Sequence, residues 1–126
     1  MTDVVLDTSA VLADLLNEPG AERVRGVTGA RLSAVNFAEV VAKLIDKGFA
    51  PEDARGTAFR LSADVVPMDQ DDAAEAGVLR QSTRRFGLSL GDRACLALAS
   101  RMRASVLTAD RAWAQLDLGV DIQLIR

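Results

Sequence analysis

Four acidic residues of this 126-residue chain are of a type and spacing that could do chemistry together. Asp7 and Asp110 come just past predicted strands, Asp92 lies in the first turn of a buried helix, and Glu39 lies beside the apolar face of another. The right-handed crossover rule brings the ends of consecutive parallel strands to one edge of a sheet, so we expect the four carboxylates to converge. Converging carboxylates repel one another unless a cation shares them, and Mg²⁺ or Mn²⁺ suits an all-oxygen site. Such an ion activates water and stabilises charge on a phosphoryl group.

The residues that are missing narrow the chemistry. The chain has no His and no Tyr, which excludes a Ser-His-Asp triad, a Cys-His pair and a zinc site with His ligands. Its single cysteine, Cys95, cannot form an internal disulfide, which fits a reducing cytoplasm. A net charge of −3 argues mildly against nucleic-acid binding, although net charge hides how charge is distributed.

The elements that must position the acids alternate between strand and helix. Val4 to Leu6 reads as a buried strand, and Asp7-Thr-Ser9 starts a helix directly after it. We expect further strands and helices as follows: strands at 30–33, 64–67, 105–108 and 122–125, and helices at 21–27, 34–47, 51–61, 69–85 and from about 90 onward. This alternation favours one α/β domain over residues 1–126 with a mostly parallel, doubly wound sheet. Neither a signal peptide nor a membrane-spanning stretch is visible.

Helix capping is the simpler interpretation for most of these acids. Asp7, Asp92 and Asp110 each stand where a helix begins, and the order Ser89-Leu-Gly-Asp92 fits a capping box. Glu39 is harder to explain in this way, because an acid among apolar residues in mid-helix is costly without a partner, unless it lies at the solvent border. We expect Cys95 and Trp113 to be packing residues, and the remaining acids to be solvated or matched to helix dipoles, among them Asp14, Glu18, Glu22, Asp46, Glu52, Asp53, Asp69, Asp71, Asp72 and Glu75.

Four short motifs together resemble PIN domains, and closely the VapC-type toxins of toxin–antitoxin modules. Each motif is weak alone, but the four occur in the right order and spacing over nearly the whole chain. They are Leu6-Asp-Thr-Ser-Ala10, Asn36-Phe-Ala-Glu-Val40, Leu90-Gly-Asp-Arg-Ala-Cys-Leu-Ala97 and Leu107-Thr-Ala-Asp-Arg111.

The resemblance implies a three-layer α/β/α sandwich and an Mg²⁺- or Mn²⁺-dependent endoribonuclease. It implies Asp7, Glu39, Asp92 and Asp110 as the acidic, metal-binding site. Ser9 and Thr108 would orient carboxylates or waters, although hydroxyls at such positions are more often caps or turn residues. The resemblance also implies a homodimer, a VapB-type antitoxin as partner, and a structured RNA, commonly a transfer RNA, as substrate.

The candidates for RNA contact are the arginines that flank Asp92 and Asp110, namely Arg84, Arg85, Arg93 and Arg111. Two alternatives stay open. A PIN nuclease outside a toxin module would share the acidic site but have no antitoxin. A non-catalytic receiver-like module would need a Lys near its acceptor Asp, and the only lysines, Lys43 and Lys47, lie on one predicted surface helix.

Overall fold

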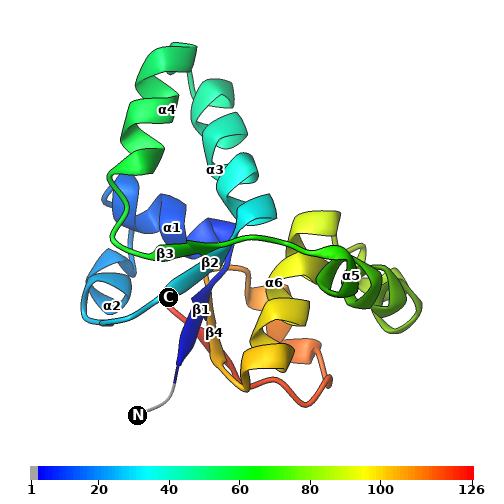
Figure 1. Ribbon diagram of the computed structural model, residues 1–126. Helices are drawn as coiled ribbons and strands as arrows, with labels where there is room; N and C mark the ends of the chain where they lie inside the picture. The colour runs from blue at the N-terminus through cyan, green and yellow to red at the C-terminus, as the bar shows by residue number, and fades with distance from the viewer. Residues whose placement is uncertain (1–2) are drawn as a thin grey trace.

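The computed structural model describes residues 3–126 and is organised around a five-stranded sheet in which all four strand pairings are parallel (Figure 1). The strand order is β3-β2-β1-β4-β5. The strands are short: β1 Val4–Leu6, β2 Arg31–Ser33, β3 Asp64–Val66, β4 Ser105–Thr108 and β5 Ile122–Leu124. The chain first builds outward from β1 through β2 to β3, and then returns to place β4 on the other side of β1. The predicted mostly parallel sheet is therefore confirmed.

Helices cover the two faces of this sheet. The α-helices are α1 Thr8–Leu15, α2 Ala21–Arg25, α3 Ala34–Asp46, α4 Pro51–Phe59, α5 Gln70–Thr83 and α6 Leu90–Met102. In Figure 1 the α3–α4 pair rises above the sheet on one side, while α5 lies beside α6 on the other. Successive side chains of β1 point to opposite faces of the sheet. Leu6 packs with α1 to α4 on one face, and Val5 packs with α6 on the other. This is the three-layer α/β/α arrangement that the sequence predicts.

Local sequence explains where α3 and α6, the two longest helices around the site, begin. Ser33 ends β2 and also starts α3, since its hydroxyl accepts a hydrogen bond from the Val35 amide at 3.2 Å. Ser89 starts α6 with a complete capping box: its hydroxyl accepts from the Asp92 amide, and the Asp92 carboxylate accepts from the Ser89 amide. The carboxyl end of β2 and the start of α6 are therefore fixed in place.

The structure departs from the sequence-based expectations in small ways. The helix expected at 69–85 ends at Thr83 and passes into a 3₁₀ turn, η1 Arg84–Phe86. A second 3₁₀ turn, η2 Arg111–Gln115, follows Asp110, where the sequence predicted a helix start but gave no bounds. Asp72, expected to be solvated, is instead buried, because α5 packs against α6 at this point and Arg101 pairs with it at 2.7 Å.

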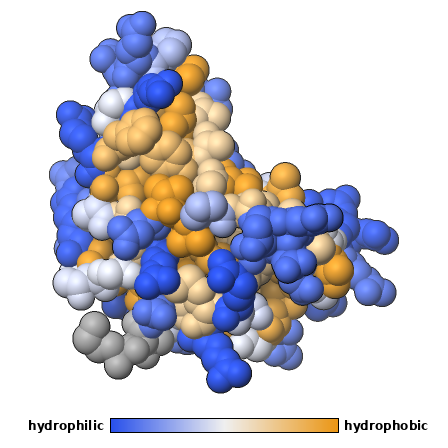
Figure 2. All heavy atoms as spheres, viewed as in Figure 1, coloured by the Kyte–Doolittle hydropathy of each residue, from blue (hydrophilic) through white to orange (hydrophobic). Residues whose placement is uncertain are grey.

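An apolar groove is open on the surface between α3 and α4. It is lined mainly by Phe37, Val41, Ile45 and Phe59, of which Phe59 is 65% exposed. Figure 2 shows apolar side chains gathered on this part of the surface. Ile45, on the apolar face of α3, is 42% exposed here. Across residues 3–126, no helix has the length and apolar character needed to cross a membrane.

Candidate acidic active site

The acidic residues gather at the carboxyl ends of β1 and β4, which is the point where the strand order of the sheet reverses. These strands are neighbours although about 100 residues separate them, and the Asp7 amide continues their ladder by donating to the Leu107 carbonyl at 3.0 Å. In open α/β sheets, ligands bind in the crevice at this switch point. The fold therefore places Asp7 where a ligand would bind.

Asp7 is a buried carboxylate, only 3% exposed. Its Oδ2 accepts hydrogen bonds from the hydroxyls of Ser9 at 2.7 Å and Thr108 at 2.8 Å. Its Oδ1 is buried and has no hydrogen-bond partner. The pKa of Asp7 is raised from 3.8 to about 6, chiefly by burial and to a smaller extent by the charge of Asp92, while the hydroxyls of Ser9 and Thr108 hold the rise down. Asp7 precedes α1, but its side chain makes no capping bond, so the capping interpretation fails here.

The hydroxyls of Ser9 and Thr108 both contact Asp7. Beyond its bond to Asp7, the Ser9 hydroxyl accepts from the Ala109 amide at 2.9 Å and lies 3.2 Å from the Thr108 hydroxyl. These bonds hold the start of α1 and the end of β4 against the same carboxylate oxygen. Both hydroxyls therefore orient Asp7 while leaving Oδ1 free.

Glu39 is brought to the same region from α3. Its Oε1 accepts a hydrogen bond from the Thr8 hydroxyl at 2.8 Å, and its carboxylate lies directly against Gly91 in the first turn of α6. The side chain is half-buried and contacts residues of both α1 and α6. Asp92, one residue beyond Gly91, is only partly buried.

The buried thiol of Cys95 lies within electrostatic reach of three of the predicted acids. Burial raises its pKa well above the usual value, and the charges of Asp7, Asp92 and Glu39 raise it further. Cys95 is fully buried, as expected, and its thiol lies 3.8 Å from the Leu6 carbonyl. Three of the four predicted acids thus share one neighbourhood around α6 and the end of β1.

Asp110 is placed differently from the other three. It is exposed, and its Oδ1 caps η2 by accepting from the Ala112 amide at 3.0 Å, so the capping interpretation is correct for this residue. Its backbone is nevertheless tied to the site. The Asp110 amide donates to the Thr108 hydroxyl at 3.0 Å, and that hydroxyl donates to Asp7. Asp110 therefore stands at the rim of the site.

The four carboxylates share one feature that suits a cation. Within residues 3–126, each has one oxygen that accepts a hydrogen bond from the protein, while its other oxygen accepts none. Such an all-oxygen donor set matches the preference of Mg²⁺ and Mn²⁺, and the unpartnered Asp7 Oδ1 needs a positive partner most. The described side chains form no group of three or more acids already arranged to hold a metal. The residues present fit such an ion in the chemistry of their donor atoms.

Two of the four candidate RNA-binding arginines donate hydrogen bonds to carbonyl groups of the protein itself. Arg93 donates to the Ala76 carbonyl at 3.0 Å and is half-buried, so it links α6 to α5. Arg111 donates to the carbonyl of Arg126 at 2.9 Å. Arg84 and Arg85 are exposed in η1, where the Arg85 guanidinium lies 4.8 Å from the centre of the Phe86 ring.

Sequence reasoning missed Thr8, Asn36 and Gly91 as parts of this site. Asn36 is fully buried and donates to the Thr8 hydroxyl and the Gly91 carbonyl. The signal in the sequence was an amide on the apolar side of a helix, three residues before Glu39. It is weak, because nothing local reveals which distant groups such an amide meets.

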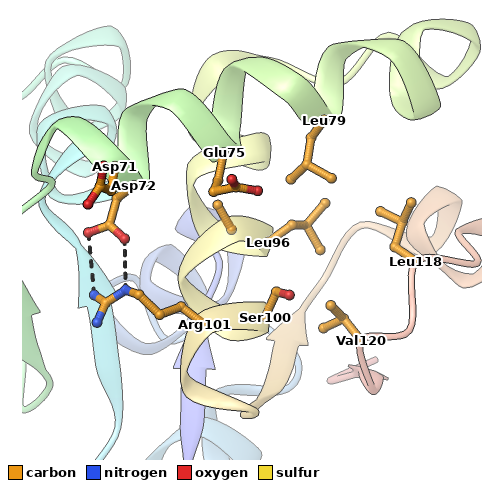
Figure 3. A pocket seen from close by; sticks show the side chains of 10 residues that line it. Asp71, Asp72, Glu75, Leu79, Leu96, Ser100, Arg101, Leu118 and Val120 are labelled. Carbon is orange, nitrogen blue, oxygen red and sulfur yellow. Dashed lines mark hydrogen bonds and ion pairs between the residues drawn. The ribbon is translucent and has the colours of Figure 1, made fainter.

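A separate cavity of about 280 Å³ opens between α5, α6 and the loop before β5 (Figure 3). Leu79, Leu96 and Leu118 line its apolar side, and the Asp72–Arg101 ion pair borders it. None of the four predicted acids lines this cavity. It is therefore not part of the acidic site.

Comparison with known families agrees with this geometry. The profile described as PIN domain matches residues 4–118. The chain belongs to the PIN-domain family. The match spans all three clustered acids and Asp110, and it removes the receiver-like alternative. Curated protein sequences give no match.

Solved structures show the same PIN fold at low sequence identity. A DNA-bound VapBC complex from Salmonella typhimurium is 22% identical, with a TM-score of 0.76 and all of both chains covered. A toxin–antitoxin complex from Klebsiella pneumoniae is 21% identical, with a TM-score of 0.73 and 98% of each chain covered. VapC20 from Mycobacterium tuberculosis, a toxin that cleaves the sarcin-ricin loop, is 15% identical, with a TM-score of 0.73 over 94% of this chain and 98% of that one. At these identities the likeness establishes the fold.

Proposed function

We propose that this PIN-domain protein is a divalent-metal-dependent endoribonuclease and the toxin of a VapBC-type toxin–antitoxin pair. One observation carries the proposal most directly. Asp7 is a buried carboxylate at the switch point of the sheet, with one oxygen held by two hydroxyls and the other without a partner. A fold keeps such a costly group when a ligand compensates it, and perturbed carboxylates in a crevice are typical of active sites.

Asp7, Glu39, Asp92 and Asp110 would hold Mg²⁺ or Mn²⁺. When bound, the ion supplies positive charge that balances the acids and stabilises charge developing on a phosphate. The chain's own groups supply orientation. Ser9 and Thr108 fix the Asp7 carboxylate, and the start of α6 holds Asp92 through its capping box.

A phosphodiester of RNA would approach the acids from the solvent side, where Asp110 lies. The substrate would be a structured RNA, with transfer RNA as the first class to test. Arg84 and Arg85, the two exposed arginines beside the start of α6, are the remaining candidates for phosphate contact. Arg93 is a poorer candidate, because its guanidinium is engaged with α5.

The partners would be a VapB-type antitoxin and a second copy of this chain. Solved structures similar to this chain are toxin–antitoxin complexes, which supports an antitoxin as partner. The exposed apolar groove between α3 and α4 is of the kind in which a partner's amphipathic helix docks. A basic residue of the antitoxin would balance the acids when no metal is bound.

The catalytic part of the proposal is tested with purified protein and total transfer RNA. Wild type should cleave only when Mg²⁺ or Mn²⁺ is present, and chelation with EDTA should stop the reaction. Asp92→Asn should fold with an unchanged circular dichroism spectrum and show no cleavage. Arg23→Gln, on the exposed surface of α2, serves as the control that keeps wild-type cleavage. Full cleavage by pure Asp92→Asn would reject the assigned site.

The toxin part is tested separately by co-expression with the adjacent reading frame of the genome. A small partner should co-purify, remain bound through size exclusion and suppress cleavage. Cleavage without any such partner would instead indicate a PIN nuclease outside a toxin module. Transcripts mapped after brief induction would identify the RNA.

A further inference from the structure

A chain of buried polar groups runs from α3 through α1 to Glu39. Asn36 is fully buried, and its Nδ2 donates to the Thr8 hydroxyl at 3.0 Å and to the Gly91 carbonyl at 3.1 Å. The Thr8 hydroxyl in turn donates to Glu39 Oε1 at 2.8 Å. Three elements that are far apart in sequence, α1, α3 and α6, therefore meet at these side chains.

The available hydrogens allow only one donor-to-acceptor direction along this series of hydrogen bonds. The Asn36 amide has two hydrogens, and Thr8 and Gly91 accept them. Since the Thr8 oxygen accepts from Asn36, its single proton is left for Glu39, which presents an acceptor there. The Glu39 carboxylate is thus held by a donor that is itself oriented.

Gly91 completes the arrangement because it has no side chain. It occupies the second position of α6, in the first turn of the helix. A Cβ at this position would overlap the Glu39 carboxylate. Glycine therefore leaves the space in which this carboxylate lies, next to Asp92.

We propose that Thr8, Asn36 and Gly91 together position Glu39 at the first turn of α6. Thr8 donates a hydrogen bond to the Glu39 carboxylate, and Asn36 orients the Thr8 hydroxyl. Gly91 leaves the space that the carboxylate occupies. The inference rests on the proposed nuclease function for its catalytic consequence. Its structural content, the fixed placement of Glu39, does not depend on that function. The three residues are positioning residues, since each acts through Glu39.

The first experiment uses metal-free protein and asks whether Thr8 and Glu39 are coupled. The unfolding equilibrium constant is measured in urea for Thr8→Val, Glu39→Ala and the double variant. A double-mutant cycle should show non-additivity of at least about threefold, because the hydrogen bond joins a hydroxyl to a carboxylate. Thr83 is the matched control, since it is a buried threonine whose hydroxyl donates to the Leu79 carbonyl at 2.7 Å. Thr83→Val should be additive with Glu39→Ala. Additivity for Thr8 as well would overturn the proposal.

The second experiment uses Mn²⁺ and RNA in single-turnover cleavage. Thr8→Val should slow cleavage at saturating RNA at least tenfold with KM within threefold, and should weaken Mn²⁺ binding in thermal titrations. Thr8→Ser, which keeps the hydroxyl, should recover most of the rate. Thr83→Val should lose stability but keep the wild-type rate. Equal rates for Thr8→Val, Thr83→Val and wild type would leave Thr8 a purely structural role and overturn the proposal.

Gly91→Ala provides a variant that removes no hydrogen-bonding group. It should slow cleavage at least tenfold by displacing Glu39, and combining it with Thr8→Val should add less than threefold, because both changes disturb the same carboxylate. A wild-type rate for Gly91→Ala would overturn the role of the glycine. Should wild type itself cleave no RNA with Mn²⁺, the proposed function fails, while the metal-free cycle still decides whether Glu39 is positioned in this way.

Discussion

Two buried aspartates on opposite sides of α6 illustrate how this fold treats negative charge. Asp72, 8% exposed, faces Arg101 at 2.7 Å. Asp7, 3% exposed, forms no ion pair with any Lys or Arg among the described residues and keeps one oxygen without a partner. Both carboxylates are removed from water, yet only Asp72 is neutralised by the protein, through the ion pair with Arg101 that Figure 3 shows.

The difference separates a charge that the fold neutralises from one that it leaves uncompensated. The Asp72–Arg101 ion pair links α5 to α6. Because Arg101 neutralises the Asp72 carboxylate, that carboxylate needs no further cation. A buried carboxylate that only hydroxyls satisfy is unfavourable when ionised, and it becomes favourable when a cation arrives. The comparison therefore predicts that Asp7 responds to metal and pH, and that Asp72 responds to neither in the same way.

The largest expected difference is in catalysis. Asp7→Asn should reduce metal-dependent RNA cleavage by about 10³-fold or more, because loss of ion-mediated charge stabilisation is worth several kcal/mol. Asp72→Asn should cleave at the wild-type rate, provided that circular dichroism shows it folded. Rates are measured under single turnover with the same RNA. A comparable loss in both variants would remove the distinction between the two aspartates.

Metal should stabilise only the protein with an intact Asp7. At Mn²⁺ concentrations about 100 times the dissociation constant, binding to the native state contributes about 2.7 kcal/mol, which raises Tm by about 10 °C in a chain of this size. Asp72→Asn should show the same rise, and Asp7→Asn little or none. Melting curves with Mn²⁺ and with EDTA test this. An undiminished rise in Asp7→Asn would place the ion elsewhere.

The pKa of Asp7 gives the metal-free protein a specific pH dependence. Because this pKa rises from 3.8 to about 6 on folding, native Asp7 holds a proton between pH 4 and 6 that the unfolded chain has lost. Its contribution to stability is therefore lost as the pH rises through about 6. The shift corresponds to about 3 kcal/mol.

Asp7→Asn should accordingly stabilise the metal-free protein by about 2 kcal/mol at pH 8, somewhat less than the full shift, because the new amide must reorient against Ser9 and Thr108. The gain should disappear near pH 4, where native Asp7 is protonated. Urea unfolding at several pH values measures the difference between variant and wild type. A difference that does not vary between pH 4 and 8 would contradict the burial of an uncompensated charge.

Removing the cation from the other aspartate should have the smallest effect and the opposite sign. Arg101→Met keeps most of the aliphatic packing but leaves Asp72 without its partner, which should cost about 1 kcal/mol because Arg101 is half-exposed and solvent screens the pair. Urea unfolding with and without Mn²⁺ tests this. The wild-type response to Mn²⁺ should persist, and a stabilised variant would show that the pair does not hold α5 to α6.

The fold was largely predictable from the chain because its signals are local. The buried run Val4–Leu6 followed by Asp7-Thr-Ser9, the capping box at Ser89, and the alternation of strands and helices each depend on near neighbours. For the short 3₁₀ turn η2, the sequence predicted a cap at Asp110 and packing at Trp113 but not the extent of the turn, which depends on how β4 and β5 pack around it.

What the sequence determined by itself was the donor set: oxygen ligands, no imidazole, and acids placed at the ends of strands and the starts of helices. Tertiary structure decided which acids meet. Asp7, Glu39 and Asp92 share one neighbourhood, Asp110 stands at its rim, and Asp72 finds Arg101. The physical reason is that propensity and capping act over a few residues, whereas burial and pairing depend on groups up to about 100 residues away, such as Thr108 for Asp7. Whether a carboxylate ends as a cap, an ion pair or an unpartnered charge is therefore settled only when the layers close.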